Sequence, residues 1–392
     1  MAHSSHKKPR LLFVVNVDWF FESHRLPIAL AALQAGFDVH VACAVTDRAD
    51  AIENTGIIVH KVPLSRGGTN PIAELRSALS LAMILYRLKP DVLHAVTIKP
   101  VLYCGMLAHI LRPQQFVCSI SGLGSVFSSD SSRIRVIKFF VAGLYRIALH
   151  HARLSVIFQN ETDRDILQQI AKLLRVQTLL VSGSGVDLNL YAVIPTPPVD
   201  PPVFVIAARL ILEKGILEFL EAARLVHEAG YSARFVVAGK LDPSNPHSMT
   251  SSEMTKWKSI GAAEFVGHVD DIPKLFAAAS VVVLPSYYGE GFPKVLMEAA
   301  AAGRAVITTD HPGCRDAIIS DKTGILVQPR NVDSLFDAFV RLIRDPALVA
   351  DLGNRGRELA RQRFSIEFIV KEHLQLYANV RRMHDKGVDS YT

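Results

Sequence analysis

Short apolar runs alternate with longer amphipathic stretches along the chain, and this pattern predicts strands joined by helices. In the first half, the runs that indicate buried strands end near Val17, Val45, Val62, Val96, Ile120, Phe158 and Val181. Helical periodicity lies between some of these runs, over residues 26–35, 72–88 and 161–170. Strands that alternate with helices are typical of a doubly wound parallel sheet, so an α/β fold is expected.

The alternation restarts after a proline-rich stretch, and this indicates a second domain. Residues 194–202 contain five prolines, a composition typical of a stiff linker. Beyond it, strands are expected over residues 203–208, 233–238, 263–266, 281–284, 305–308 and 324–327. We therefore predict a first domain over 1–193, a linker over 194–202 and a second domain over 203–365. The length of 392 residues suits two domains better than one.

The last part of the chain, residues 366–392, is predicted to begin with a helix. Apolar residues recur there at helical spacing up to about residue 383, at Ile366, Phe368, Ile369, Leu374 and Leu376. The segment follows the last expected strand of the second domain and is treated as a separate element.

Composition indicates a globular chain with a sizeable core, because 49% of the residues are hydrophobic and 20% are charged. No apolar run reaches the roughly 18 residues that a membrane-spanning helix needs. The apolar run at residues 11–17 follows basic residues but is interrupted by polar ones, so it is interpreted as a strand and not as a signal peptide. The four cysteines show neither metal-binding nor disulfide spacing, which favours a reducing, cytoplasmic location.

The positive charge is concentrated in the first half of the chain. Residues 1–193 hold 20 Lys and Arg against 13 Asp and Glu, a net charge of +7, although the whole chain carries +6. An anionic partner is therefore expected on the first domain. No zinc-finger, RNP-type or aromatic-interleaved basic motif is present, so nucleic acid is not expected. A phosphate-bearing substrate or an anionic membrane surface agrees better with this pattern.

Two glutamates, Glu290 and Glu298, lie in a segment whose expected structure changes between them. Gly289 and Gly291 permit a tight loop, and Pro293 suits the first position of a helix. Glu290 is therefore expected in a loop at the start of a helix, and Glu298 inside that helix. Such strand–loop–helix junctions are where open α/β sheets bind ligands. A helix N-terminus favours phosphate, so a phosphorylated sugar or a nucleotide is expected.

Two cations, Arg209 and Lys214, follow the first expected strand of the second domain. A strand end followed by a helix start places these side chains close to free backbone N–H groups. Such an arrangement suits an anion. The alternative is that Arg209 and Lys214 form an ordinary exposed pair in the first helical turn.

Several motifs in a fixed order resemble the retaining glycosyltransferases of family 4, which have the GT-B fold. The pattern begins with two glutamates eight residues apart in a Glu-Gly-Phe-Pro context. The other matching segments are residues 23–27, 183–187, 208–215, 265–269 and 309–316. The resemblance covers nearly the whole chain and implies two Rossmann-like domains facing across a cleft. It also implies that the terminal helix within 366–392 crosses back to the first domain.

The resemblance assigns roles to the second-domain residues. It implies that Arg209 and Lys214 bind the diphosphate of a nucleotide-sugar donor, where cations stabilise the charge that develops on the leaving group. Glu290 is expected to contact the donor sugar and Glu298 the ribose. The donor loop also includes Gly289, Gly291, Phe292 and Pro293. By the same resemblance, no catalytic metal or other cofactor is needed.

Candidate acceptor-side residues lie in loops that follow strands of the first domain. They are Asn16, His24, Arg25, His94, Lys99, Gly122 and Gly124, together with Gly185 at the end of that domain. The loop after the first strand lacks a G-x-G-x-x-G pattern, which argues against a nicotinamide dehydrogenase. His24 and Arg25 are expected either to face an acceptor phosphate or hydroxyl, or to have capping or surface roles. The same two interpretations apply to His94 and Lys99.

The segment 133–146 alternates basic and apolar residues, and it has two interpretations. A basic amphipathic helix with aromatic residues can lie in a bilayer interface and is attracted by anionic lipid. Alternatively, the helix is half buried against its own domain, which is the more common case. The first interpretation would place the protein on the inner face of the cell membrane.

The resemblance therefore implies a retaining transfer of sugar from a nucleotide-sugar, expected to be a UDP-sugar, to a hydroxyl of a saccharide acceptor. Relatives of this motif type extend lipid-linked saccharides for bacterial surface polysaccharide, which implies a polyprenyl-diphosphate-linked acceptor. Two alternatives stay open. One is a nucleotide-sugar epimerase of the same fold, and the other is a non-catalytic protein that binds nucleotide-sugar.

Overall fold

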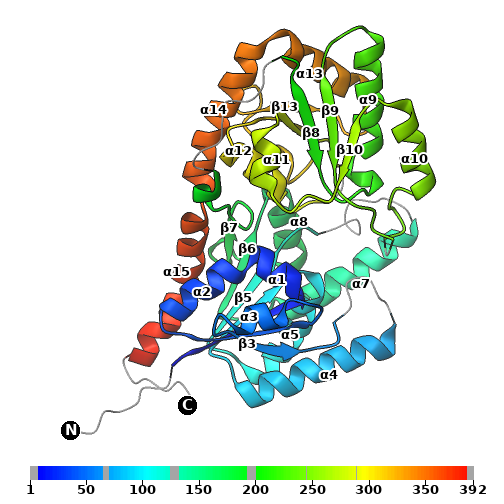
Figure 1. The fold of residues 1–392 in the computed structure, drawn as a ribbon. Helices are drawn as coiled ribbons and strands as arrows, with labels where there is room; N and C mark the ends of the chain where they lie inside the picture. Colours follow the sequence, from blue (N-terminus) through cyan, green and yellow to red (C-terminus); the bar gives the residue numbers. More distant parts are fainter. Residues whose placement is uncertain are drawn as a thin grey trace. The chain divides into compact units, whose positions relative to one another are not determined.

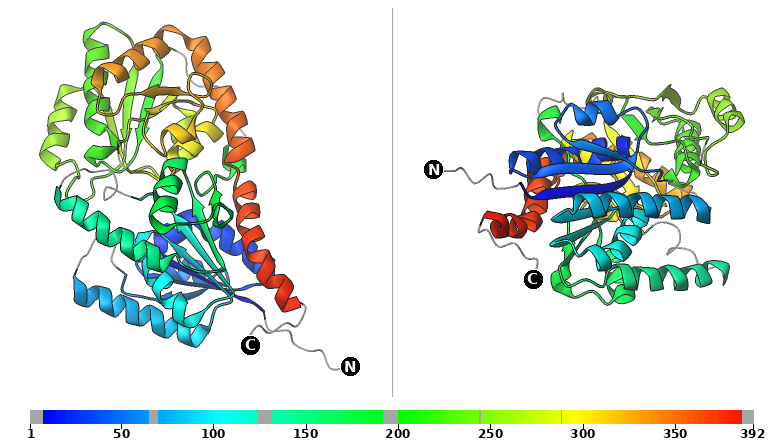
Figure 2. Two further views of the ribbon diagram at one scale, coloured as in Figure 1. Left: turned by 180° about the vertical axis from the view of Figure 1, so that it is seen from behind. Right: turned by 90° about the horizontal axis from the view of Figure 1, so that it is seen from below.

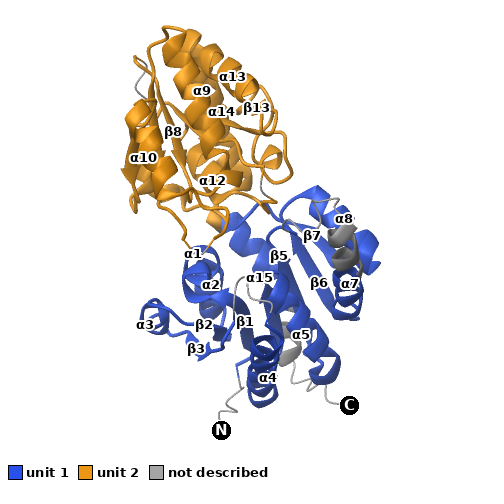
Figure 3. Cartoon of the chain, turned by 90° about the vertical axis from the view of Figure 1, so that its right-hand side faces the viewer, with its two compact units in different colours: residues 1–184, 367–392 blue, residues 185–366 orange. Residues whose placement is uncertain are grey.

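The computed structural model describes residues 8–64, 70–123, 132–191, 200–243, 245–287 and 289–385, with only the backbone for 132–139 and 379–385. The chain forms two compact units, shown in Figure 3. Unit 1 comprises residues 1–184 and 367–392, and unit 2 comprises residues 185–366.

The first division between the units lies after Ser184, before the predicted domain end at residue 193. The segment that follows belongs to unit 2 because the N–H of Val186 donates to the carbonyl of Phe364 at 2.8 Å, and that of Ile366 donates to Val186 at 3.0 Å. Most of the predicted linker 194–202 lies outside the described residues. The second division falls after Ile366, so the terminal helix α15 (Ile366–Asp385) is grouped with unit 1 almost entirely.

Unit 1 is built on a seven-stranded parallel sheet with strand order β3-β2-β1-β4-β5-β6-β7. The strands are β1 (Arg10–Val17), β2 (Asp38–Ala44), β3 (Ile58–Lys61), β4 (Val92–Val96), β5 (Gln115–Ile120), β6 (Leu154–Phe158) and β7 (Thr178–Leu180). Each ends within one residue of its predicted end. The prediction succeeds because strands buried on both faces appear as continuous apolar runs.

Helices cover both faces of this sheet. One face carries α1 (Asp18–His24), α2 (Leu26–Gln34), α3 (Ala49–Glu53) and α15, which share a core with Phe13 and Val41. The other face carries α4 (Pro71–Leu88), α5 (Ile98–Leu111), α7 (Ser132–Ala148) and α8 (Glu161–Ala171). A one-turn helix, η1 (Arg175–Gln177), precedes β7.

Unit 2 contains a six-stranded parallel sheet with strand order β10-β9-β8-β11-β12-β13. Its strands are β8 (Val203–Ala207), β9 (Arg234–Ala238), β10 (Glu264–Gly267), β11 (Val281–Leu284), β12 (Ala305–Thr309) and β13 (Ile325–Val327). The two cores lie on opposite faces of the sheet. The doubly wound α/β prediction is therefore confirmed for both halves of the chain.

The helices of unit 2 pack on both faces of its sheet (Figures 1 and 2). One face carries α9 (Ile216–Glu228), α10 (Ser251–Ile260) and α13 (Val332–Arg344), and the other carries α11 (Ile272–Ala277) and α12 (Lys294–Ala301). Helix α14 (Pro346–Arg363) contributes to both cores. Short helices complete the unit: η2 (Leu188–Tyr191), η3 (Leu212–Lys214) and η4 (Arg315–Ala317).

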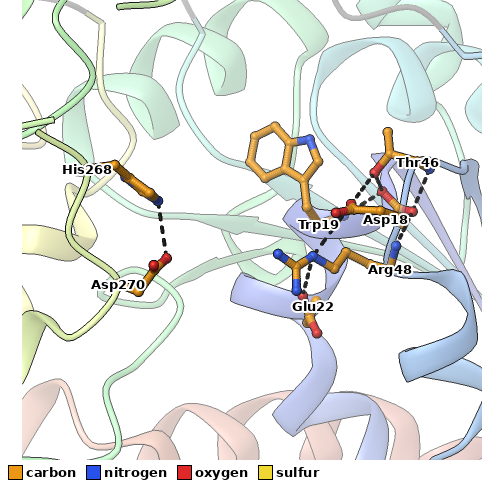
Figure 4. Close-up of polar contacts among 8 residues, drawn as sticks. Asp18, Trp19, Glu22, Thr46, Arg48, His268 and Asp270 are labelled. Carbon is orange, nitrogen blue, oxygen red and sulfur yellow. Dashed lines mark hydrogen bonds and ion pairs between the residues drawn. The ribbon is translucent and has the colours of Figure 1, made fainter. Parts of the chain in front are cut away.

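A buried carboxylate, Asp18, fixes the carboxyl ends of β1 and β2 in unit 1. It accepts hydrogen bonds from the backbone N–H of Thr46 at 2.6 Å, the Thr46 hydroxyl at 2.7 Å and the backbone N–H of Arg48 at 3.1 Å (Figure 4). Burial raises the pKa of Asp18, but these hydrogen bonds and one from Trp19 outweigh it, so the pKa is lower than usual. Asp18 therefore has a structural role.

Replacing Asp18 with Asn is expected to lower the free energy of unfolding by about 1–3 kcal/mol, because an amide cannot accept all these bonds. A lowered carboxyl pKa contributes stability above the unfolded pKa near 3.8, and that stability is lost as the pH falls through the folded value. Urea denaturation should therefore show a difference from wild type at pH about 7 that shrinks in acid. The exposed neighbour Asp47→Asn should change stability by less than about 0.5 kcal/mol at neutral pH.

Candidate functional site

The loop after β8 places Arg209 and Lys214 at the carboxyl edge of the unit 2 sheet. Lys214 ends the short helix η3, and Gly215 then adopts a φ of +75° as the N-cap of α9. A Cβ atom on Gly215 would overlap the carbonyl group of Pro285, which follows β11. The glycine therefore allows η3 to lie directly against the end of β11, the strand that precedes the Glu290 loop.

Hydrogen bonds and an ion pair join η3 to the loop after β11. The carbonyl of Glu213 accepts from the N–H of Tyr287 at 2.9 Å and from the hydroxyl of Ser286 at 3.1 Å. Lys214 Nζ forms an ion pair with Glu290 Oε1, and both side chains are about 15% exposed. Two candidate residues from separate motifs are thus in direct contact. A cation and a carboxylate held together at this edge could bind a phosphate and a sugar hydroxyl.

The residues after Glu290 lead into α12. Phe292 is buried, with its ring 5.4 Å from the ring of Phe364. Pro293 is the N-cap of α12 and has an extended ψ of 120°. The prediction that Pro293 is the first helical residue is therefore wrong by one position. Gly289 and Gly291 lie in the loop as expected.

A second loop, residues 310–316 after β12, supports the Glu290 loop from the side. Gly313 has a φ of +81°, and a Cβ atom there would lie 2.5 Å from the Glu290 carbonyl oxygen and 2.7 Å from that of Gly291. The N–H of Gly313 donates to Asp316 at 2.9 Å. Only a glycine allows this close approach of two backbones. The downstream motif of the sequence therefore has a clear structural function, which is to hold the Glu290 loop.

Glu298 lies in α12 beside a pocket with a volume of about 210 Å³. The pocket lies at the carboxyl ends of three strands and is lined by Ala207, Ala208, Arg209, Ala238, Gly239, Lys240, His268, Val269, Ile272, Val295 and Glu298. Burial raises the pKa of Glu298 to about 7, although Lys294, with Nζ 3.8 Å from the carboxylate, opposes the shift. His268, at the rim, pairs with Asp270 at 3.3 Å (Figure 4). A pocket with apolar walls, nearby cations and a single carboxylate is suited to bind a nucleoside.

The structure groups the unit 2 candidates into two sets. Lys214 and Glu290 form the ion pair, whereas Arg209 lines the pocket with Glu298 and donates to Asp242 at 2.7 Å. Sequence reasoning missed Asp242, Lys240 and Gly313 as individual residues. Lys240 and Asp242 follow the predicted strand β9, and their position at a carboxyl edge was the signal that could have identified them.

In unit 1, His94 belongs to a buried network and not to an exposed loop. Its ring nitrogens contact the Tyr377 hydroxyl at 2.6 Å and the Ser119 hydroxyl at 2.7 Å. Burial, together with the nearby His373 and Arg25, keeps the pKa of His94 well below its usual value. His94 is therefore neutral and links β4 to α15 and β5, which favours the structural interpretation.

Arg25 is almost completely buried between α1 and α2. One of its terminal nitrogens donates to the carbonyl of His24 at 2.9 Å, and its Nε has no hydrogen-bond partner in the described part of the chain. Burial lowers the pKa of Arg25 to about 10, so the guanidinium remains charged. His24 stacks on Phe20 with ring centroids 4.2 Å apart. A buried cation without a carboxylate partner is costly, and this makes Arg25 the candidate best suited to receive an anion.

The other first-domain candidates differ from one another in their contacts. Asn16 lies near the carboxyl end of β1, and its Oδ1 is buried without a hydrogen-bond partner in the described part of the chain. Lys99 pairs with Glu74 at 2.6 Å, which favours a structural role. Gly122 has a φ of +105°, and Gly185, at +82°, lies in unit 2. Gly124 lies outside the described residues.

Neither a metal cluster nor a spanning helix is found where the structure describes the chain. No group of three or more His, Cys, Asp or Glu side chains there is placed to hold a metal ion. No helix within the same residues is both long enough and apolar enough to cross a bilayer.

Two families match successive parts of the chain. The family described as "Glycosyl transferase 4-like" matches residues 10–160, and the family "Glycosyl transferases group 1" matches residues 192–359. The first match covers most of the unit 1 sheet, and the second covers the strands and loops that carry Arg209, Lys214, Glu290 and Glu298.

Relatives and solved structures agree with these matches. The chain is 25% identical over 368 residues to the N,N'-diacetylbacillosaminyl-diphospho-undecaprenol alpha-1,3-N-acetylgalactosaminyltransferase of Campylobacter jejuni, covering 91% of this chain and 95% of that protein. It is 24% identical to the UDP-Gal:alpha-D-GlcNAc-diphosphoundecaprenol alpha-1,3-galactosyltransferase of Escherichia coli, covering 80% and 81%. Anabaena HepE in complex with UDP has a TM-score of 0.74 at 18% identity, covering 95% and 100%. The chain therefore belongs to the glycosyltransferases of family 4 and has the GT-B fold.

Proposed function

We propose that this glycosyltransferase moves a sugar from a UDP-sugar to a hydroxyl of a lipid-linked saccharide and retains the anomeric configuration. The Lys214–Glu290 ion pair, held at the edge of a sheet whose neighbouring pocket contains Glu298, is the observation that carries the proposal. The name of the Escherichia coli relative specifies a UDP-sugar donor and a diphosphoundecaprenol acceptor. The choice of UDP and of a lipid-linked acceptor rests on that likeness.

In this proposal, unit 2 binds the donor. The nucleoside occupies the pocket, where the Glu298 carboxylate accepts hydrogen bonds from the ribose hydroxyls. Lys214 and Arg209 bind the diphosphate, and Glu290 orients the donor sugar. Cations aimed at the leaving diphosphate stabilise the transition state more than the ground state. Because these two cations neutralise the leaving diphosphate, the proposed role needs no metal.

Transfer breaks the bond between the anomeric carbon and the diphosphate oxygen and forms a bond from that carbon to the acceptor oxygen. We assign the acceptor proton to an oxygen of the departing diphosphate, which leaves on the same face that the acceptor attacks. Unit 1 binds the acceptor, and the buried Arg25 guanidinium supports an anionic acceptor group there. A stable glycosyl–enzyme ester, detected by mass spectrometry, would contradict this direct attack.

A transfer assay tests the proposal. The purified protein is incubated with labelled UDP-, GDP- and dTDP-sugars, with and without bacterial lipid extract, and both free nucleotide and labelled lipid are measured. Labelled lipid that forms only from one UDP-sugar is the expected result. Conversion of the nucleotide-sugar without lipid would instead identify an epimerase, and binding without turnover would identify a non-catalytic binding protein.

A further inference from the structure

Helix α4 of unit 1 presents an unusual apolar stripe to solvent. Five large apolar side chains lie three or four residues apart, at Ile72, Leu75, Leu79, Met83 and Tyr86, and each is 53–67% exposed. This spacing places all five on one side of the helix. The opposite side of α4 packs on the sheet through Leu81 and Leu85. An apolar stripe of this length on a surface helix indicates an interaction site.

The neighbouring helices extend this surface. Helix α5 contacts both α4 and α7, and all three cover the same face of the sheet (Figure 2). Their outward sides add large exposed apolar residues, which are Met106 and Ile110 on α5 and Phe140, Leu144 and Ile147 on α7. We call the outward sides of α4, α5 and α7 the α4–α7 face. Unit 2, in its described part, exposes only scattered large apolar residues: Leu190, Ile260, Val266 and Ile319.

The charge of the α4–α7 face is positive where its side chains are described. Arg76, Arg87 and Arg146 are exposed there, and Glu74 is the one acidic residue in the sequence of the three helices. Glu74 already pairs with Lys99 at 2.6 Å. Arg76 and Arg87 lie on α4 and are exposed beside the apolar stripe. A partner that binds this face must therefore offer an apolar surface to the stripe and negative charge to the surrounding cations.

A pocket of about 190 Å³ continues the stripe at the carboxyl ends of α4 and α5. Its walls include the apolar side chains of Leu85, Tyr86 and Ile110, and three exposed cations, Lys89, Arg112 and Arg153, line it as well. Asp91 is the one acidic residue among the lining residues, and it accepts hydrogen bonds from Arg10 and Gln114. The pocket therefore combines apolar walls with cations, as the α4–α7 face does.

We propose that unit 1 binds the surface of an anionic bilayer through the α4–α7 face, with α4 lying in the plane of the membrane. An interfacial helix inserts apolar side chains at the boundary of headgroups and acyl chains, and flanking cations attract anionic lipid. Helix α4 has 18 residues and a length of about 27 Å, enough for all five apolar residues to reach the interface together. This binding is independent of the proposed sugar transfer.

The test is co-sedimentation of the full-length protein with vesicles, without donor or acceptor. Wild type should bind phosphatidylglycerol-containing vesicles, bind pure phosphatidylcholine vesicles weakly, and dissociate from the former as salt rises. Leu79→Glu/Met83→Glu should weaken binding by at least about tenfold, since it places two anions among the apolar residues. The control, Ile260→Glu/Val266→Glu in unit 2, should bind as wild type does.

Charge is tested separately from apolar contact. Arg76→Gln/Arg87→Gln should weaken binding to phosphatidylglycerol vesicles by about tenfold or more, whereas Lys256→Gln/Lys258→Gln on α10 should have little effect. Each variant should keep its thermal midpoint and its affinity for UDP, which show that it is folded. The proposal would be overturned if the wild type did not sediment with anionic vesicles. It would also be overturned if the α4 variants sedimented with them as well as the wild type does. Light scattering that shows a wild-type dimer and monomeric α4 variants, with no vesicle binding, would identify a second copy as the partner.

Discussion

Replacing Lys214 with Met is expected to lower the rate of sugar transfer by about 10²–10³-fold, because the cation that stabilises the leaving diphosphate is lost. Glu290→Gln is expected to cause a loss of similar size by removing the carboxylate that orients the donor sugar. Each is measured as kcat and KM with a saturating acceptor. Arg355→Met, which removes the cation of an exposed ion pair on α14, should leave the rate near wild type.

The Lys214–Glu290 pair also has a structural role, which the same variants can separate from the catalytic one. Both side chains are largely buried, so removal of one partner leaves the other as an unpaired charge and should lower the free energy of unfolding by up to about 3 kcal/mol. The double variant Lys214→Met/Glu290→Gln leaves neither charge. We therefore expect its stability to recover toward wild type while its transfer rate stays at least as low as that of the single variants.

A double variant that regains both stability and activity would show that the ion pair only supports the fold. In that case Arg209 and Glu298 would have to bind the donor without Lys214 and Glu290. Single variants that retain near-normal rates while remaining folded would reject the assignment of the donor site to this edge of the sheet.

The strands could be predicted from sequence because each is a short apolar run bounded by polar residues. Buried strands such as β4 and β11 consist almost entirely of Val, Leu, Ile and Ala, which is the expected pattern for a sheet covered on both faces. The positions at which helices begin and end could be predicted less exactly. Pro293 illustrates this, since proline is compatible with both the N-cap and the first helical position.

The partners of the candidate residues could not be predicted in the same way. Lys214 and Glu290 are 76 positions apart, and no local pattern indicates that their side chains meet. The same holds for His94 and Tyr377, which are 283 positions apart. The sequence around a histidine in a strand is the same whether its side chain faces a substrate or a buried tyrosine. Which of the two His94 faces depends on where α15 packs on unit 1, and the local sequence around His94 carries no information about that packing.

The stripe on α4 shows a different limit. Sequence reasoning considered the basic segment 133–146 as a membrane-binding helix and treated residues 72–88 as an ordinary helix. Apolar residues of α4 occupy more than one side of the helix, so periodicity alone does not separate the side facing the sheet from the side facing solvent. Burial makes that separation, because Leu81 is buried whereas Leu79 is 59% exposed.

Glu298 predicts a pH dependence of donor binding. Burial raises its pKa to about 7, so near neutral pH the side chain is a mixture of carboxyl and carboxylate. The carboxylate accepts hydrogen bonds from both ribose hydroxyls, whereas the neutral form has lost an acceptor position. Affinity for UDP is therefore expected to be roughly tenfold lower at about pH 6 than at about pH 8, following the fraction of carboxylate. Isothermal titration calorimetry at several pH values measures this.

The Glu298→Gln variant supplies the control, because the terminal phosphate of UDP titrates in a similar range. The difference between the two pH profiles isolates the contribution of Glu298, and equal slopes would contradict the proposed ribose contact.

The stability of the protein without ligand provides an independent measurement of the same pKa. A raised carboxyl pKa contributes stability that is fully present below the unfolded value near 4.5 and is lost as the pH rises through about 7. Wild type should therefore lose up to about 3 kcal/mol relative to Glu298→Gln across this range, in urea denaturation without nucleotide. Nucleotide binding and stability should thus respond to pH in opposite directions, since the ligand requires the charged form that the folded protein alone disfavours.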